Sequence, residues 1–144
     1  MNDLSVTIGP RAKSKDWRTK RMPWQDIVSM LKDHTEGQKD GPGVIFGALE
    51  SDGPRTNERV VERSAIALDL DDGTPMDTLK RTLESRGWAC CVYSTHSHTP
   101  EHPKWRVVIP LAKPVRREDF DSQGAFAEHW RKLNESVAAD LGFE

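Results

Sequence analysis

The order of regular elements in the second half of the chain is the feature that most constrains its fold. Three short apolar runs have strand length, and two segments place apolar side chains at helical spacing, in the order 64–70, 76–86, 88–94, 105–111 and 117–141. The order strand, helix, strand, strand, helix begins a ferredoxin-like or RRM-like sheet, which ends with one more strand. We therefore predict an α+β fold with a β-α-β-β-α core whose final strand is missing.

The first half of the chain is less regular, and we predict that it adds to this core. Residues 1–22 show no clear periodicity, and their second half is rich in basic side chains, namely Arg11, Lys13, Lys15, Arg18, Lys20 and Arg21. We expect a basic, extended or flexible arm over residues 1–22 and a single domain over residues 23–144. A short helix beginning at Pro23 and a strand over Val44–Leu49 are the expected N-terminal additions to a mixed sheet packed by helices.

Charge and composition exclude some classes of protein. The formal net charge is −2, so a protein that is basic all over is excluded, and nucleic acid would have to bind local clusters such as residues 11–21 or the arginines of residues 55–63. For each cluster, a solvated surface is the alternative. Apolar runs are too short to span a membrane, no secretory signal is visible, and adjacent Cys90 and Cys91 are poorly placed for a disulfide. We expect a reduced, cytoplasmic protein.

Two acidic side chains end the first apolar run of the core. Asp69 and Asp71 are two positions apart, so they share one face of a strand. Carboxylates this close repel each other unless a cation lies between them, and their oxygens suit Mg²⁺ or Mn²⁺. We predict that Asp69 and Asp71 are metal ligands and catalytic carboxylates of a phosphoryl-transfer site. The alternative is an acidic turn in which Asp72 and Thr74 cap the following helix.

The polar segment over residues 93–106 joins the two later strands. Its hydroxyl, imidazole and basic side chains can bind a triphosphate. In the predicted sheet the third strand lies beside the first, so Arg106 would stand opposite the acidic strand end, where nucleotidyl transfer needs a cation. Three histidines, His96, His98 and His102, leave a zinc site as a weaker alternative, since no cysteine lies near them.

Three segments together resemble one known family. Val60–Asp71 (VVERSAIALDLD), Tyr93–Pro100 (YSTHSHTP) and Lys104–Leu111 (KWRVVIPL) are similar to the archaeo-eukaryotic primase superfamily, closest to the primase-polymerase domains of phage and plasmid replication proteins. The resemblance extends over about residues 17–144 and is strongest over 58–114. It implies a nucleotidyltransferase that adds nucleotides to a 3′-hydroxyl on a DNA template.

The resemblance also implies roles for particular residues. Asp69 and Asp71 would hold Mg²⁺ or Mn²⁺, and the residues on the nucleotide's phosphates would be Ser97, His98 and Arg106, helped by Lys104. Single-stranded DNA, nucleoside triphosphates and a helicase, fused or separate, are the implied partners. The family's third acidic motif has no match here, so residues 23–144 would be a primase-type catalytic core truncated at its C-terminus, part of a longer replication protein and poorly active alone.

Other functions remain open on the same residues. A non-catalytic, single-stranded nucleic-acid-binding module with a degenerate primase fold would use arginines and could stack bases on Trp17, Trp24 and Trp105, although packing is the commoner fate of Trp. A His-hydrophobic-His replication nickase would share the half-sheet, with Tyr93 as nucleophile, but Ser97 stands where it needs an apolar residue. A haloacid-dehalogenase-like phosphatase is disfavoured, because Asp72 shifts the D-x-D-G-T spacing.

Overall fold

The computed structural model describes residues 3–32, 43–95 and 98–143. It contains strands, α-helices and two 3₁₀ turns in the order β1 (Leu4–Gly9), β2 (Arg18–Met22), α1 (Trp24–Lys32), β3 (Gly43–Ile45), β4 (Gly47–Leu49), η1 (Asn57–Arg59), β5 (Val60–Leu70), α2 (Met76–Arg86), β6 (Cys91–Ser94), β7 (Trp105–Arg116), η2 (Arg117–Asp119) and α3 (Gln123–Asp140). The predicted α+β class is confirmed. Among the described residues, no helix is both long and apolar enough to cross a membrane.

The strands form two sheets, ordered β2-β1-β3 and β4-β5-β7-β6. The segment β5-α2-β6-β7-α3 is the predicted β-α-β-β-α unit. Its strands β5 and β7 are the two central strands of the second sheet. The expectation of a mixed sheet is wrong, because every pairing between the described strands is antiparallel. No strand follows α3 within the described residues, and short β4 pairs with the first part of β5 on the edge that the final strand of a ferredoxin-like sheet would occupy.

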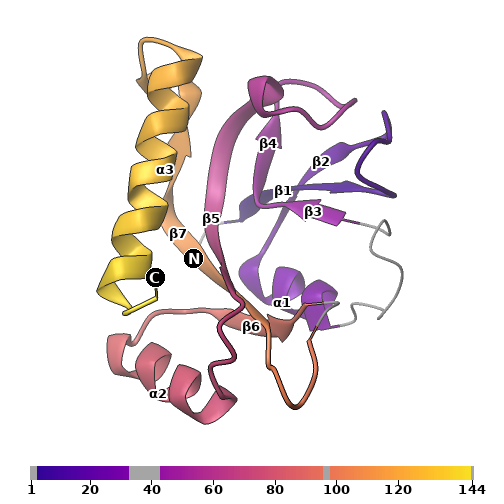
Figure 1. Ribbon diagram of the computed structural model, residues 1–144. Helices are drawn as coiled ribbons and strands as arrows, with labels where there is room; N and C mark the ends of the chain where they lie inside the picture. The colour runs from indigo at the N-terminus through magenta and orange to yellow at the C-terminus, as the bar shows by residue number, and fades with distance from the viewer. Residues whose placement is uncertain (1–2, 33–42, 96–97, 144) are drawn as a thin grey trace.

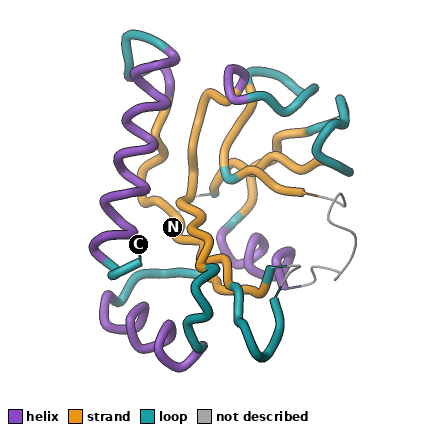
Figure 2. Tube along the Cα trace, in the orientation of Figure 1, coloured by secondary structure: helices purple, strands orange, loops and turns teal. Residues whose placement is uncertain are grey.

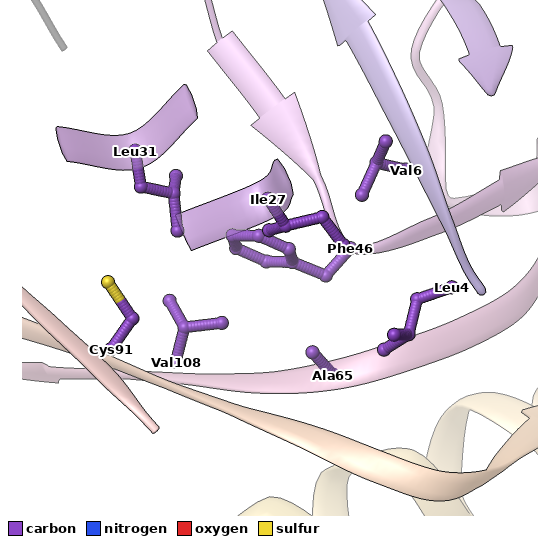
Figure 3. Packing of buried hydrophobic residues seen from close by; sticks show 8 residues of the cluster. All are labelled: Leu4, Val6, Ile27, Leu31, Phe46, Ala65, Cys91 and Val108. Atoms are coloured by element: carbon purple, nitrogen blue, oxygen red, sulfur yellow. The ribbon is translucent and has the colours of Figure 1, made fainter. Parts of the chain in front are cut away.

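The four-stranded sheet is covered on both faces (Figure 1). Helices α2 and α3 cover one face, where Ile66, Leu79 and Val107 are in the same buried cluster. Helix α1 and the three-stranded sheet cover the other face, where Figure 3 shows Phe46 beside Ile27 of α1, with Val108 nearby. Both faces of β5 and β7 are therefore largely committed to packing, and polar side chains become accessible only where this cover ends.

The structure contradicts the expectation that residues 1–22 form an arm apart from the domain. Strand β1 is central in its sheet, and Leu4 and Val6 are 5% and 0% exposed in the core. The opposite face of β1 is also buried, and on it the Thr7 hydroxyl donates to the carbonyl of Gly47. Trp17 is 2% exposed, so it cannot stack on bases as the nucleic-acid-binding alternative supposed.

A buried carboxylate joins the two sheets. Glu62 of β5 is 7% exposed, accepts a hydrogen bond from the Ser5 hydroxyl of β1, and pairs with Arg116 Nε at 2.9 Å. Burial by itself raises the pKa of Glu62, but the hydrogen bonds from Ser5 and Arg116 outweigh it, so the net pKa lies below the ordinary value. The ionised carboxylate therefore stabilises the folded state.

This network predicts a pH-dependent stability. Glu62→Gln is expected to lower the free energy of unfolding by about 1.5–3 kcal/mol at pH 7, the usual contribution of hydrogen bonds to a charged group. Because the folded-state pKa is lowered, the contribution is complete above the ordinary pKa of a glutamate and is lost as the pH falls through the lowered value. Urea unfolding at pH 7 and at pH 3 measures the free energy of unfolding above and below the ordinary pKa of a glutamate. If Glu62→Gln lowers the free energy of unfolding by the same amount at the two pH values, Glu62 does not stabilise the fold through its ionised form.

Candidate functional site

Asp69 and Arg106 form the centre of the candidate site. They lie opposite each other on β5 and β7, and Arg106 Nε donates to Asp69 Oδ1 at 2.7 Å while Nη2 donates to Oδ2 at 3.3 Å. A guanidinium that meets both oxygens of a carboxylate fixes the orientation of both groups. The hydrogen bond from Arg106 raises the pKa of this arginine above its usual value, so the guanidinium stays charged. The predicted position of a cation opposite the acidic strand end is confirmed.

Tyr93 is the third member of this group. It is opposite Arg106 in the β6–β7 register, and the guanidinium carbon lies 6.0 Å from the centre of its ring. Burial raises the pKa of the Tyr93 hydroxyl, so the ring presents a neutral phenol beside the cation. The sequence analysis considered Tyr93 only as the nucleophile of a nickase. Tyr93 is two positions from Cys91, which is buried in the core, so both side chains lie on the same face of β6. This spacing in the sequence could have placed Tyr93 beside Arg106.

The site lies where the cover over the sheet ends. Ala65 is buried under α1 and the three-stranded sheet, whereas Ala67 and Asp69, on the same face of β5, are exposed. The side chains of Asp69 and Arg106 are 50% and 39% exposed. A ligand can therefore approach this pair from solvent while the strands beneath it remain fixed by their backbone pairing.

Asp71 and Asp72 follow the strand and have different surroundings. Asp71 is exposed, and its backbone carbonyl accepts a hydrogen bond of 2.9 Å from His102 Nε2. Asp72 Oδ1 accepts from both the backbone and the hydroxyl of Thr74, and these bonds lower the pKa of Asp72. The alternative interpretation of Asp72 is thus confirmed in part: Asp72 stabilises the turn before α2, although Pro75 is the N-cap residue.

Two loops meet beside Asp71. The segment between β5 and α2 and the segment between β6 and β7 lie near each other at the end of the sheet (Figure 2). Trp105 Nε1 donates to the carbonyl of Thr74 at 2.9 Å, and the His102 ring lies over Gly73, where a β-carbon would be 3.2 Å from Nδ1. His102 remains exposed while its ring holds the acidic turn in place.

His98 and Lys104 form a separate pair. His98 Nδ1 lies 3.1 Å from the backbone N–H of Lys104 and 3.3 Å from its carbonyl oxygen, so the Lys104 backbone holds the ring and leaves Nε2 on its other side. The His98 ring contacts Trp105, with centroids 4.6 Å apart. Trp105 faces the side of β7 opposite Arg106, so the predicted phosphate-binding residues are divided between two groups. Ser97, and His96 of the zinc alternative, lie outside the described residues.

The two carboxylates do not form a complete metal cage. Within residues 3–32, 43–95 and 98–143, no three or more His, Cys, Asp or Glu side chains gather to hold a metal. Mg²⁺ is, however, commonly bound by one or two carboxylates, with substrate phosphates and water completing its shell. Asp69 and Asp71 supply the hard oxygen donors for such a shared ion. The residues present therefore fit an ion that arrives with a nucleotide.

A separate groove lies at the other end of β5. This groove of about 800 Å³ is lined in part by Arg21, Glu62, Arg116 and Phe120. Arg116 and Arg21 lie 2.9 Å and 3.9 Å from the buried Glu62 carboxylate, and the lining as a whole balances three arginines with three carboxylates, Glu62, Glu118 and Asp121. We therefore place the candidate site at Asp69, where the acidic and basic groups are accessible, and not in this groove.

One comparison with known proteins gives a match. The family model described as the VapE N-terminal domain matches residues 29–141 of the 144-residue chain, which includes every element from β3 to α3 and the residues Asp69, Asp71 and Arg106. No curated protein and no solved structure matches the chain.

Proposed function

We propose that this chain, which belongs to the VapE N-terminal domain family, contributes a metal-dependent nucleotidyl-transfer site to the replication of a phage or plasmid. The family is that of the N-terminal domains of VapE-like phage and plasmid replication proteins, so the chain is replication-associated. The observation that supports nucleotidyl transfer is the accessible Asp69–Arg106 pair at the end of two central strands, with Asp71 two residues further on. It combines carboxylate oxygens with a guanidinium, the groups that a metal-bound triphosphate requires.

In this proposal each group has a distinct role. Asp69 and Asp71 hold Mg²⁺ or Mn²⁺, and the ion supplies Lewis-acid stabilisation of charge on the phosphates. Arg106 binds phosphate oxygens, and His98 donates through Nε2, the ring nitrogen that the Lys104 backbone leaves without a contact to itself. Ser97 and the Lys104 side chain assist on the phosphates. The 3′-hydroxyl of a primer attacks the α-phosphate, the new phosphodiester bond forms, and pyrophosphate leaves.

The proposed partners follow from this reaction. A single-stranded DNA template would supply sequence, and nucleoside triphosphates would supply the added nucleotide. A helicase, on the same chain or separate, would expose the template. The cytoplasm of a bacterium is the proposed location.

A second candidate is a non-catalytic module that binds single-stranded nucleic acid. The observation that favours it is the neutralisation of Asp69 by Arg106, together with the lack of a third acidic ligand among the described residues. Loss of the carboxylates would then remove only negative charge from the surface. DNA binding by Asp69→Ala/Asp71→Ala would be unchanged or slightly stronger.

Calorimetry distinguishes the two candidates. A nucleoside triphosphate is titrated into the wild type and into Asp69→Ala/Asp71→Ala, with and without Mn²⁺. For a nucleotidyl-transfer site, binding is expected to need Mn²⁺ and to weaken by at least about tenfold in the double variant, because Asp69 and Asp71 would hold the ion that neutralises the phosphates. Asp72→Ala is the matched control, since its carboxylate is engaged with Thr74. Binding of the nucleotide that ignores both Mn²⁺ and the carboxylates would favour the module.

A further inference from the structure

We propose that Arg106 exchanges between two partners, Asp69 in the empty site and the triphosphate in the loaded site, so that metal and nucleotide bind cooperatively. This inference rests on the proposed function and deepens it, because it states how the same site is controlled. In this scheme Arg106 keeps the Asp69 carboxylate away from the metal ion until the nucleotide binds. The consequence is that the divalent ion alone binds weakly, and that nucleotide releases the carboxylate to which the ion binds.

The first step is that Asp69 already has a charged partner, Arg106. Both carboxylate oxygens accept from Arg106, at 2.7 and 3.3 Å, so the side chain is already oriented toward a cation. A divalent ion bound to Asp69 would come within a few ångströms of the guanidinium, and two cations at that separation repel. The observed pair and a metal-bound Asp69 are therefore in competition. Asp71 alone, on the loop after β5, would offer the ion one carboxylate in place of two and so bind it more weakly before the phosphates arrive.

The second step is that the pair can open. Both side chains are well exposed, 50% for Asp69 and 39% for Arg106, and ion pairs in such surroundings contribute little free energy. The strands need not move, because the backbone register of β5 and β7 fixes both Cα positions. Arg106 also retains the Tyr93 ring, 6.0 Å from its guanidinium carbon, as a surface along which it can turn. Only the long arginine side chain has to move.

The third step is a comparison within the same strand. Arg116 of β7 makes a similar bond to Glu62 of β5, with Nε at 2.9 Å. The Glu62 side chain is only 9% exposed and also accepts from Ser5, so opening that pair would leave a buried charge without compensation. The two arginine–carboxylate pairs on β5 and β7 thus differ in the exposure of the carboxylate, 50% for Asp69 and 9% for Glu62, and in the extra hydrogen bond that Glu62 accepts from Ser5. The Asp69 pair is suited to exchange and the Glu62 pair to structure.

The fourth step is thermodynamic. If the triphosphate takes Arg106 away from Asp69, the nucleotide raises the affinity for the ion, and the ion must raise the affinity for the nucleotide by the same factor. Phosphate oxygens are good partners for the released guanidinium, because they accept its hydrogen bonds in the same forked geometry as a carboxylate. Arginine suits this exchange, since its planar fork of donors matches either partner.

The test measures Mn²⁺ binding without any nucleotide, by the loss of the free-ion electron paramagnetic resonance signal. Arg106→Gln is expected to bind Mn²⁺ about five- to tenfold more tightly than the wild type, in the range of ordinary coupling between sites. Arg106→Lys keeps the charge beside Asp69 and is expected to stay near the wild type. Arg116→Gln is the matched control on the same strand and should leave Mn²⁺ affinity unchanged. Circular dichroism checks that each variant is folded.

A second titration uses inorganic tripolyphosphate, which has the phosphates without base or sugar. In the wild type it should tighten Mn²⁺ binding beyond its effect on the free ion, and in Arg106→Gln that gain should fall by about fivefold or more. Equal Mn²⁺ affinity in the wild type and Arg106→Gln would overturn the exchange while leaving the metal site intact. No Mn²⁺ binding by any variant would overturn both the metal site and the exchange, so the two failures are distinct.

Discussion

Replacing Trp17 by alanine is expected to lower the free energy of unfolding by about 3–5 kcal/mol, the range for a large aromatic side chain removed from a core. The indole is 2% exposed, packs in a buried cluster with Leu49, Val60 and Phe126, and donates from Nε1 to the carbonyl of Arg11 at 3.2 Å. A large cavity beside both sheets would remain. The loss would show that residues outside the matched family region stabilise the domain.

Urea unfolding followed by far-ultraviolet circular dichroism measures this loss, and Trp88→Ala is the matched control. Trp88 is 42% exposed, so its removal should cost less than about 1 kcal/mol. A second variant tests the same contact from the other side. A β-carbon at Gly9 would lie 2.2 Å from the Trp17 ring, so Gly9→Ala should also destabilise the protein. Equal effects of Trp17→Ala and Trp88→Ala would show that the N-terminal strands are dispensable.

Local patterns predicted the second half of the fold well. Helix α2 runs over Met76–Arg86 as the spacing indicated, and Gly87 ends it with the positive φ of 66° that glycine accepts. The third strand was predicted over residues 105–111, between Trp105 and the segment with Pro110 and Pro114, but β7 continues to Arg116. Pro110 pairs with Ala65 next to a register shift in β5, an irregularity at which a strand tolerates proline. The prolines therefore mark a bulge and not an end.

The long helix shows a second local error. Periodicity suggested a helix from residue 117, whereas α3 begins after Ser122, whose hydroxyl accepts from the backbone N–H of Ala125. Residues 117–119 form a 3₁₀ turn before it. The serine was a visible helix-start signal, and the apolar spacing of the preceding residues concealed it.

The N-terminal strands could not be predicted because their partners are remote in sequence. The polar residues of β1, Ser5 and Thr7, are buried and bond to Glu62 and to the carbonyl of Gly47. Residues 44–49 read as one strand, yet the chain leaves one sheet at Ile45 and enters the other at Gly47. A β-carbon at Gly47 would lie 2.0 Å from the Glu62 carbonyl oxygen, so glycine permits this close crossing. Such long-range contacts leave no local period.

The candidate site was predictable to the extent that it lies on strands. Alternation placed Asp69 and Arg106 on one face, and the sheet order brought them together, as observed. Their direct ion pair was not foreseen, because the same pattern fits a carboxylate that holds a metal and one that holds an arginine. The loop residues were less predictable, since His98 and His102 are oriented by the backbone groups of Lys104 and Asp71.

Asp69→Asn is expected to reduce the rate of nucleotide addition to a primed single-stranded template by roughly a hundredfold to a thousandfold. This follows from the loss of several kcal/mol of metal-ion stabilisation, at about 1.4 kcal/mol for each factor of ten. Asparagine keeps the shape and one oxygen acceptor for Arg106, but it removes the negative charge that would bind the ion in the proposed site. The measurement is incorporation of a labelled nucleotide with Mn²⁺ under single-turnover conditions, in which the chemical step is observed directly.

Three isosteric variants in one short segment separate metal binding from local structure. Asp71→Asn should resemble Asp69→Asn, because both carboxylates are assigned to the ion. Asp72→Asn should retain nearly the full rate, since the asparagine oxygen can still accept from Thr74 and stabilise the turn. If all three variants lose the rate equally, the acidic segment acts through its fold or its total charge. If Asp69→Asn alone is impaired, Asp71 is not a ligand, and the ion depends on Asp69 and the nucleotide phosphates.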